Sequence, residues 1–327
     1  MTATQALDGD FMTLAEPHRR ELLAHCYRMT GSIHDAEDLV QDTLVRGWRG
    51  YADFKGDSSL RTWLYRIATN TCLTWLEGRK RRPLPAGLGA PSSQASDELV
   101  ERHEIAWLEP FPHTGSIDDD PASMVGSRES VRLAFVAALQ HLSARQRAVL
   151  VLREVLQWRA SEVAELLGTT PAAINSLLQR ARAQIDLIMP DEDSVDEPES
   201  PETRELLRRY VEGFETYDID GIVKLFAAEA IWEMPPFVGW YRGAENIGAL
   251  ISGKCPASGP ESMRMVATTA NGQPAFGLYM LGLDGVHRPF QLHVLEVIDS
   301  RITHVASFFD VTLFEKFGLP AVYTAVA

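Results

Sequence analysis

Apolar residues recur every three or four positions in two separate parts of the chain, and this spacing predicts amphipathic helices. Residues 11–82 show it in three successive segments, marked by Leu22, Leu23 and Cys26, by Leu39, Val40 and Leu44, and by Leu60, Trp63, Leu64 and Ile67. Residues 128–189 show it again. We therefore expect two all-α domains, over residues 1–82 and 128–189.

The pattern changes after residue 202. One more amphipathic helix is marked by Leu206, Leu207, Tyr210, Val211 and Phe214. Apolar and polar residues then alternate, as strands with one buried face do, through Phe290, Leu292 and Val294, and, after an Asp299-Ser300 turn, through Ile302, His304, Ala306 and Phe308. Residues 203–327 are predicted to form a separate α+β domain.

Two acidic stretches without helical periodicity separate these domains. Residues 83–127 are rich in Pro, Ser, Gly and Asp, and residues 190–202 are rich in acids and prolines, so both are predicted to be linkers. Within the first, residues 107–112 read Trp-Leu-Glu-Pro-Phe-Pro, which is unusually apolar for a tether. This segment is either a loop packed on a neighbouring domain or a docking segment.

The net charge of −14 is distributed unevenly. Residues 1–82 carry +1 and residues 128–190 carry +3, whereas residues 83–127 carry −7 and residues 191–327 carry −11. Because affinity for DNA depends on neutralising phosphates, the intact chain is expected to bind free DNA poorly. The acidic tail could instead attract the two basic modules.

Other features of the sequence narrow the class of protein. Cys26, Cys72 and Cys255 are scattered without the spacing of a zinc site or a disulfide framework, so no metal or cofactor is predicted and a reducing cytoplasm is expected. The chain has no long uncharged apolar run, and residues 1–10 lack the features of a signal peptide, so no membrane association is predicted.

Residues 159–182 have the pattern of a helix-turn-helix. Ala164 suits the inner face of a first helix, Gly168 suits the tight turn, and Pro171 suits the first turn of the next helix. A second helix placed in the major groove could read bases with Asn175, Ser176, Gln179, Arg180 and Arg182. A simple helical hairpin is the alternative. Arg145 and Arg147 are candidate phosphate contacts.

Residues 34–82 have a different composition. Acids are concentrated in the first turns of a predicted helix from Asp35 to Leu44, where they suit the helix dipole or a basic partner. A loop at residues 54–59 follows, and then a segment in which aromatic and basic residues alternate. Such a combination suits single-stranded DNA, because rings stack on exposed bases and cations follow the backbone.

The strings HCYRMTGSIHDAEDLVQDTL, SSLRTWLYRIATNTCL and LSARQRAVLVLREVLQW, with SEVAELLGTTPAAINSLLQRAR, resemble regions 2 and 4 of the bacterial extracytoplasmic-function sigma factors. The resemblance implies that core RNA polymerase, through its β′ clamp helices and β flap, and promoter DNA are the partners. It implies polymerase binding by Asp35, Glu37, Asp38, Gln41 and Asp42. It implies −10 element binding by Phe54, Lys55, Ser58, Ser59, Arg61, Trp63, Ile67 and Asn70, and −35 element binding by Asn175, Ser176, Gln179, Arg180 and Arg182. Asn175 stands where many members carry Arg, so no −35 sequence is predicted.

Residues 203–327 resemble the SnoaL-like branch of the NTF2-like folds, through YVEGFETYDIDGIVKLFAAEAIWEMPP, GWYRGAENIGALI and HVLEVIDSRITHVASFFDVTLFEKFG. The predicted fold is therefore multidomain: a region 2 helical bundle, a region 4 helix-turn-helix and an α+β cone. A pocket for a small-molecule ligand could involve Glu233, Trp240, Tyr241, His293, His304 and Asp310.

The predicted function is promoter-specific transcription initiation with core polymerase, with the fused domain regulating activity and no catalysis. In one alternative the tail is an active cyclase or isomerase on a DNA-binding head, since related enzymes use an Asp–His pair for acid–base chemistry. In another, the chain is a repressor that binds duplex operators without polymerase. The repressor alternative does not explain the acidic helix or the 54–59 loop.

Overall fold

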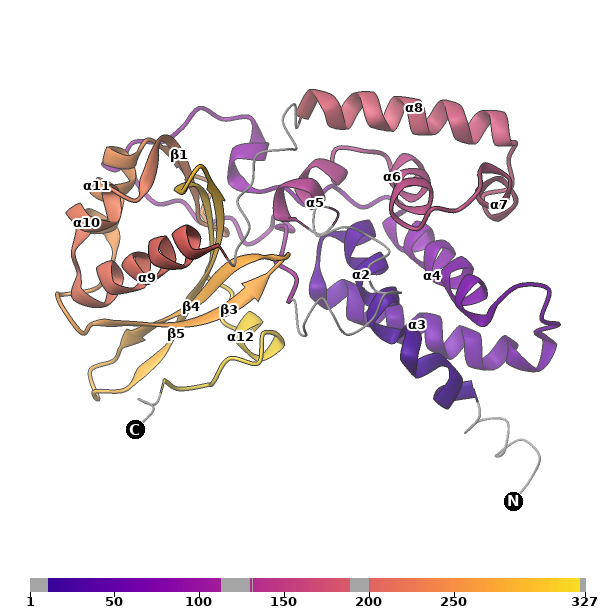
Figure 1. Ribbon diagram of the computed structural model, residues 1–327, viewed down its shortest axis with the longest axis horizontal. Coiled ribbons are helices and arrows are strands. Elements are labelled where there is room, and N and C mark those ends of the chain that lie inside the picture. The colour runs from indigo at the N-terminus through magenta and orange to yellow at the C-terminus, as the bar shows by residue number, and fades with distance from the viewer. Residues whose placement is uncertain (1–10, 113–129, 131, 189–199, 324–327) are drawn as a thin grey trace, which may run out of the picture. The chain divides into compact units, whose positions relative to one another are not determined.

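The computed structural model describes residues 11–112, 130, 132–188 and 200–323 of the 327-residue chain (Figure 1). These residues belong to two compact units, which are considered separately. The helical unit comprises the described residues of 1–82, 108–111 and 115–190, and the C-terminal unit those of 83–107, 112–114 and 191–327. The first unit is helical and the second combines helices with a sheet, as predicted.

The first part of the helical unit consists of three long helices that pack on one another: α2 (Arg19–Thr30), α3 (Ile33–Gly50) and α4 (Leu60–Leu76). Short 3₁₀ turns, η1 (Glu16–His18) and η2 (Tyr51–Asp53), flank them. The periodic apolar residues that predicted these helices fill their core, including Leu22, Cys26, Leu39, Val40 and Leu64.

Local chemistry sets the ends of these helices. Helix α2 ends at Gly31, whose φ of +72° suits a residue without Cβ. Ser32 caps α3 by accepting a hydrogen bond from the backbone N–H of Asp35 at 3.1 Å. Ser59 caps α4 in the same way through Thr62, also at 3.1 Å. Both serines thereby fix where the two helices begin.

The second part of the helical unit contains the predicted helix-turn-helix. Its helices are α5 (Leu133–Leu139), α6 (Ala144–Leu150), which continues into a π-helical turn η5 (Val151–Val155), α7 (Ala160–Leu166) and α8 (Pro171–Ile188). Gly168, with φ +59°, lies in the turn between α7 and α8. The hydroxyl of Thr170 accepts from the N–H of Ala173 at 3.2 Å, and Ile174 and Leu178 are buried. The helix-turn-helix prediction is confirmed.

The C-terminal unit is built on a six-stranded sheet with the order β2-β1-β6-β5-β4-β3. β1 and β6 are parallel and the other neighbours are antiparallel. Its strands are β1 (Phe226–Glu233), β2 (Trp240–Arg242), β3 (Met263–Ala270), β4 (Gln273–Leu281), β5 (His287–Ile298) and β6 (Arg301–Phe308). Asp299 and Ser300 have φ of 50° and 55°, which is the conformation of a tight hairpin turn, so the predicted turn between β5 and β6 is confirmed.

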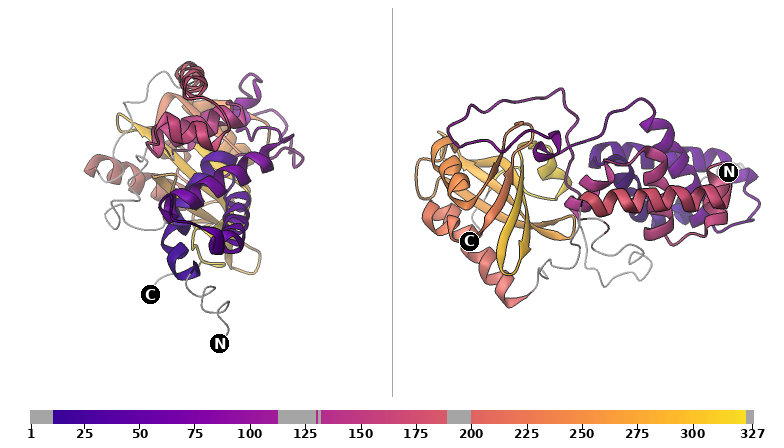
Figure 2. Two further views of the ribbon diagram at one scale, coloured as in Figure 1. Left: turned by 90° about the vertical axis from the view of Figure 1, so that its right-hand side faces the viewer. Right: turned by 90° about the horizontal axis from the view of Figure 1, so that it is seen from above.

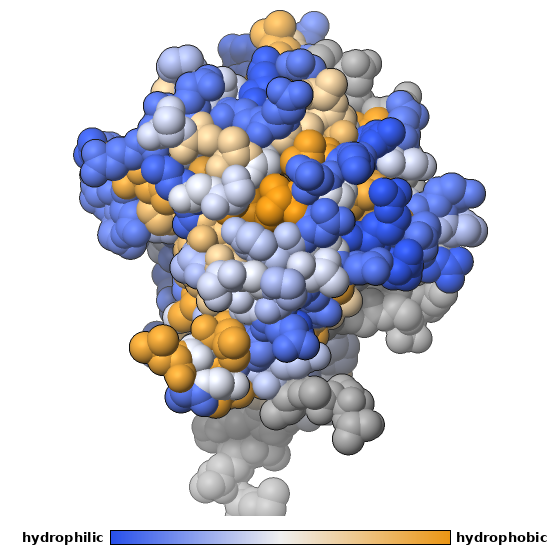
Figure 3. All heavy atoms as spheres, turned by 90° about the vertical axis from the view of Figure 1, so that its left-hand side faces the viewer, coloured by the Kyte–Doolittle hydropathy of each residue, from blue (hydrophilic) through white to orange (hydrophobic). Residues whose placement is uncertain are grey.

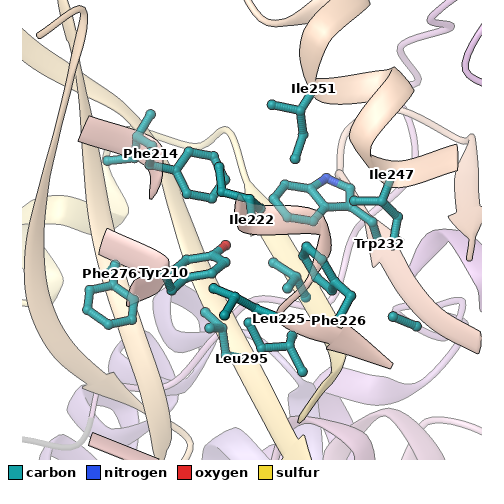
Figure 4. Close-up of a cluster of buried hydrophobic side chains, with 14 of the residues drawn as sticks. Tyr210, Phe214, Ile222, Leu225, Phe226, Trp232, Ile247, Ile251, Phe276 and Leu295 are labelled. Carbon is teal, nitrogen blue, oxygen red and sulfur yellow. The ribbon is translucent and has the colours of Figure 1, made fainter. Parts of the chain in front are cut away.

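Three helices cover the concave face of this sheet: α9 (Pro201–Thr216), α10 (Ile219–Val223) and α11 (Ala244–Lys254) (Figure 1). A short helix, α12 (Leu313–Lys316), follows β6. Tyr210 and Phe214 from α9 meet Trp232 of β1 and Leu295 of β5 in the core shown in Figure 4. Since side chains alternate along a strand, the neighbours of Trp232 and Leu295 lie on the opposite face of the sheet.

Residues 83–107 belong to the C-terminal unit, although in the sequence they lie between the two parts of the helical unit. Their trace runs along the sheet, with η3 (Pro85–Leu88) near its start (Figure 2). The N–H of Ser93 donates to Trp240 O at 2.7 Å, and the N–H of Val238 donates to Val100 O at 3.0 Å. The segment thus forms strand-like contacts beside the edge strand β2. The rest of the predicted linker from residue 113 to residue 127 and most of residues 190–202 lie outside the described residues.

Candidate polymerase and nucleic-acid interfaces

The candidate −10 residues cluster around the loop before α4 and along one side of that helix. The rings of Phe54 and Trp63 lie against each other with centroids 4.9 Å apart. Lys55 and Asn70 are exposed, and Ser58 and Ile67 are half-buried. These six residues place aromatic, basic and amide groups in the loop before α4 and along that helix as far as Asn70.

Two other candidates in this group have structural partners. Ser59 caps α4, and Arg61 pairs with Glu21 at 2.6 Å while lying over the ring of Tyr65, 5.0 Å from its centroid. Glu21 in turn accepts from the Tyr65 hydroxyl at 3.2 Å. Arg61 therefore joins α4 to α2, so its guanidinium is not free in this conformation.

The candidate −35 residues lie on α8, the second helix of the helix-turn-helix. Asn175, Ser176, Gln179 and Arg180 are all exposed, whereas Ile174 on the same helix is fully buried. They occupy successive turns of one face, because residues four apart are neighbours on a helix. Arg182 is also exposed, but it pairs with Glu154 at 2.6 Å.

Arg145 and Arg147, the two candidate phosphate contacts, both donate hydrogen bonds within the helical unit. Arg145 donates to Leu167 O, the last turn of α7, at 2.6 Å. Arg147 is only 4% exposed and donates to Met29 O and to Gln140 Oε1, so the prediction that it contacts phosphate is wrong for this conformation. Its physical role is to satisfy buried acceptors.

Within the helical unit, region 2 and region 4 are joined by buried charged groups. Arg28 of α2 donates to Ser130 Oγ at 2.9 Å, and Arg147 of α6 donates to Met29 O. Burial lowers the pKa of each of these two guanidiniums to about 10, which leaves both charged at neutral pH. At the surface, Arg66 of α4 pairs with Glu165 of α7 at 2.8 Å. No local pattern predicts these contacts, because they join residues about 100 positions apart.

The acidic helix α3 presents part of the expected polymerase face. Asp38, Gln41 and Asp42 are exposed, and Glu37 is half-buried. Asp35 is different, because it forms an ion pair with Arg82 and its side chain is only 23% exposed. The helix therefore offers an exposed acidic and amide face from its second turn onward.

Beside this face lies an apolar groove that the sequence reasoning missed. It has a volume of about 420 Å³ and is lined by Met12, Arg19, Gln41, Leu44, Val45 and Trp48. Val45 is 45% exposed and Trp48 is 43% exposed, which is high for such side chains. Their spacing from Gln41, at four and seven positions, places all three on one helical face and is the signal that could have identified them.

The six pocket candidates of the C-terminal unit do not form one group. Glu233 and His304 pair at 2.7 Å, while His293 lies on the opposite face, hydrogen-bonded to the Tyr210 hydroxyl at 2.9 Å. Tyr241 belongs to the core on the side of His293. The period of two along β1, β5 and β6 separates these residues, because adjacent positions point to opposite faces.

The remaining two candidates, Trp240 and Asp310, form hydrogen bonds with backbone groups. The indole N–H of Trp240 donates to Ala90 O at 2.9 Å, on the side where residues 83–107 run. Asp310 is exposed and accepts from the backbone N–H of Thr312 at 2.9 Å. No contact joins Asp310 to a histidine among the described residues, so the Asp–His pair of the enzyme alternative does not occur in this conformation.

Glu233 is almost fully buried and has two partners. One carboxylate oxygen meets His304 and the other accepts from the N–H of Ala86 at 2.6 Å. Burial by itself would lower the pKa of His304, but its hydrogen bond to Glu233 and the charges of Glu233 and Glu296 raise it. The pair therefore favours the charged form of His304, and the bond from Ala86 to Glu233 fixes the start of residues 83–107 on the sheet.

His293 has the opposite environment. It is fully buried among Tyr210, Phe214 and Trp232, and burial lowers its pKa to about 3. It is therefore neutral at physiological pH, and its Nε2 has no hydrogen-bond partner among the described residues. This environment suits a core histidine of the cone interior.

Another groove of the C-terminal unit has none of the six candidates in its lining. It has a volume of about 1010 Å³ and is lined by apolar residues such as Leu206, Leu225 and Phe226, by the cations Arg209, Lys224 and Arg301, and by Asp299. Elsewhere, the face shown in Figure 3 carries small apolar patches among hydrophilic side chains. In the described part of the chain, no cluster of His, Cys, Asp or Glu could hold a metal ion, and no helix is long and apolar enough to cross a membrane.

Comparison with known proteins defines the class to which these surfaces belong. Residues 14–82 match the family model of sigma-70 region 2, residues 132–185 match sigma-70 region 4, and residues 207–305 match the SnoaL-like domain. The described helix bundle, helix-turn-helix and curved sheet are thus two sigma regions followed by a SnoaL-like domain.

Comparison with individual proteins identifies the family more narrowly than the three domain models do. The chain is 63% identical over 313 residues to the ECF RNA polymerase sigma factor SigG of Mycobacterium tuberculosis, covering 95% of this chain and 84% of the relative. It is 29% identical over 282 residues to SigJ of M. tuberculosis, covering 83% and 81%. The crystal structure of SigJ superposes with a TM-score of 0.63 at 24% identity, covering 95% of this chain and 99% of that one, and so supports the fold.

The chain belongs to the extracytoplasmic-function sigma factors, and its function is promoter-specific transcription initiation with RNA polymerase. It is accordingly a transcription initiation factor. The sequence-based predictions of the family and function are confirmed.

Proposed function

We propose that the exposed face of α3 and the groove beside it form the docking surface for core RNA polymerase. Asp38, Gln41 and Asp42 supply charge and hydrogen-bond acceptors, and Val45 and Trp48 supply apolar area. Protein interfaces commonly combine an apolar centre containing an aromatic anchor with a polar rim. This combination on one helix supports a protein partner for α3. Asp35 is less suited to the role, because Arg82 already neutralises it.

The −10 element is proposed to bind at the loop before α4. Phe54 and Trp63 can stack on unpaired bases, Lys55 can approach the backbone, and Asn70 is free to pair with a base edge. Ser58 and Ile67 complete the surface, while Ser59 and Arg61 hold the loop and helix in place.

The −35 element is proposed to bind along α8. Asn175 and Gln179 have the amide geometry that pairs with adenine, Arg180 has the geometry that pairs with guanine, and Ser176 can reach either. The observation that carries this proposal is that all four side chains are exposed on the second helix of a helix-turn-helix. Arg182 is a candidate only if it leaves Glu154.

The structure shows regions 2 and 4 packed together, and this packing supports a restrained state. The names of the −10 and −35 elements place them roughly 25 base pairs apart, which is about 85 Å of duplex at ~3.4 Å per base pair. Arg147 of region 4 is hydrogen-bonded to Met29 of region 2. Two regions that are held together in this way cannot bind at opposite ends of that span. We infer that regions 2 and 4 separate when the factor binds a promoter.

The C-terminal domain is proposed to regulate this step without catalysis. It holds residues 83–107 by backbone hydrogen bonds and by the contact of Glu233 with Ala86. Its titratable pair, Glu233 and His304, is occupied by that contact, and His293 is buried and neutral. A small anionic ligand would find cations in the groove of Arg209, Lys224 and Arg301. The proposed place of action is the cytoplasm, where core polymerase and promoter DNA occur together.

Run-off transcription with purified core polymerase tests the residue assignments. The full chain is expected to yield a promoter-specific product, and Trp48→Ala and Gln179→Ala are each expected to reduce it. Trp48→Ala should act through the affinity for polymerase, and Gln179→Ala through the −35 sequence of the template. Wild-type yields from both variants would contradict both assignments.

A further inference from the structure

Residues 108–111 pack with the helices of region 2, although Leu108 comes 32 positions after the last of them, α4, ends at Leu76. Leu108 is fully buried, and the ring of Phe111 lies 4.7 Å from that of Tyr27 in α2. The Tyr27 hydroxyl donates to Glu109 O at 2.8 Å, and the N–H of Glu109 donates to Gly31 O at 2.9 Å. The backbone and the apolar side chains both fix the segment against the start of α3.

The side chain of Glu109 then caps α3. One carboxylate oxygen accepts from Ser32 Oγ at 2.8 Å, from the backbone N–H of Ile33 at 3.0 Å and from that of His34 at 3.4 Å. It also lies 3.0 Å from Nδ1 of His34. The first N–H groups of a helix have no partner within it, and the helix dipole favours a negative charge there. The acid that stabilises this end comes from about 75 residues downstream.

Arg82 joins the same cluster from the other side. Its guanidinium pairs with Asp35 in the first turn of α3, and its Nη1 lies 3.8 Å from Oε1 of Glu109. Residues 83–107 therefore leave region 2 at Arg82 and return to it at Leu108, and the two ends of this excursion are held together at α3. Residues 83–107 thus form a loop whose two ends are joined by Arg82, which contacts the carboxylates of Asp35 and Glu109.

We propose that Glu109 is a positioning residue for core polymerase binding, which acts by fixing the first turn of α3 and the Arg82–Asp35 pair. The proposal rests on the proposed function of α3 as the polymerase-docking helix. Asp38 and Gln41 lie one and two turns beyond the capped end, so fraying of the first turn displaces the face that carries them. Glu109 itself touches neither polymerase nor DNA in this role.

The test uses the full chain and two measurements. Glu109→Ala removes the cap, and Glu109→Gln keeps an oxygen acceptor while removing the charge. Glu104→Ala is the matched control, because Glu104 is an exposed acid of the same excursion and, in the described part of the chain, pairs only with Arg102 at 3.0 Å. Hydrogen exchange at the amides of residues 33–36 reports on the cap, and titration of labelled protein with core polymerase reports on affinity.

Loss of the cap is expected to speed exchange at residues 33–36 and to weaken polymerase binding about three- to thirtyfold, the range of a lost helix cap. Glu109→Gln should fall between Glu109→Ala and wild type, and Glu104→Ala should match wild type. Because a merely structural role would change exchange alone, faster exchange with unchanged affinity overturns the proposal.

Trp48→Ala separates this inference from the proposed function. If Trp48→Ala weakens polymerase binding and Glu109→Ala does not, only the positioning role fails. If neither variant affects binding, α3 is not the docking helix and both proposals fail. Should Glu109→Ala not fold, Glu109→Gln gives the same comparison with a smaller expected effect.

Discussion

The guanidinium of Arg147 donates a hydrogen bond to the backbone carbonyl of Met29, and both residues are buried. Arg147 belongs to α6 of region 4 and Met29 to α2 of region 2. Arg147 also donates to Gln140 Oε1 at 2.9 Å and to Leu142 O at 3.3 Å. One side chain of region 4 thus satisfies acceptors in both DNA-reading regions at once.

Arg147→Ala is expected to open the packing of region 4 on region 2. The substitution removes the buried guanidinium together with its hydrogen bonds and leaves the carbonyl of Met29 without this donor, which should cost about 1–3 kcal/mol of the closed packing. If the closed form restrains the factor, run-off transcription by the variant should rise at limiting concentration.

Arg153→Ala is the control for this experiment, because the hydrogen bond that it removes, from Arg153 to Trp158 O, lies within region 4. Hydrogen exchange around Met29 monitors the opening directly. Faster exchange there without any gain in transcription would show that the closed packing does not limit activity.

Substitutions on α8 should affect promoter choice. Gln179→Ala and Arg180→Ala are each expected to weaken binding by about 1–3 kcal/mol if their side chains pair with bases. The loss should shrink on templates whose −35 element has been scrambled, since no correct contact remains there. Arg182→Ala, which removes a residue paired with Glu154, should have a smaller effect that does not depend on sequence.

Trp63 should contribute to strand separation at the −10 element. Its ring lies against Phe54 and within reach of the loop at residues 54–59, so Trp63→Ala is expected to lose about 1–3 kcal/mol of base stacking. A fluorescent base analogue in the −10 element of the template measures opening, and Trp63→Phe should recover part of it. Trp75→Ala is the matched control, because Trp75 stacks on Arg79 at the far end of the same helix. An equal loss from both variants would assign the effect to helix stability.

The sequence was sufficient for features that depend on local spacing. The helical period identified α2, α3 and α4, and the positions of Ala164, Gly168 and Ile174 identified the helix-turn-helix, because each follows from interactions within a few residues. The alternation around His304 likewise identified β6 and the turn before it. The exposed positions of Asn175 and Gln179 also follow from this local period.

Contacts between distant segments could not be predicted in this way. Nothing in the neighbourhood of Glu109 indicates that its carboxylate caps a helix that begins at Ile33. The pocket candidates show the same limit, since His293 and His304 are both polar residues on strands and only the register shows that they face opposite sides. Charge counts along the chain also gave no sign that Arg28 and Arg147 would be buried.

The ion pair of Glu233 and His304 predicts a specific dependence of stability on pH. Because the folded state raises the pKa of His304 above its usual value of 6.5, the pair stabilises the fold fully below about pH 6.5, and this stability is lost as pH rises through the raised pKa. His304→Gln should therefore destabilise the C-terminal unit more at pH 6 than at pH 8.5.

Thermal unfolding of the full chain at these two pH values measures the difference. His287→Gln is the matched control, since His287 lies on β5 and contacts Glu261 O at 2.8 Å near the surface. The pKa of buried His293 is lowered to about 3, so its effect on stability has the opposite dependence on pH. Its contribution to the stability of the fold is complete above about pH 6.5 and is lost as the pH falls toward 3, because acid then charges the buried ring. That contribution is common to wild type and both variants, so it cancels in the comparison. If His304→Gln lowers the unfolding temperature equally at both pH values, the pair is not ionic, and Glu233 holds Ala86 without the help of a charged histidine.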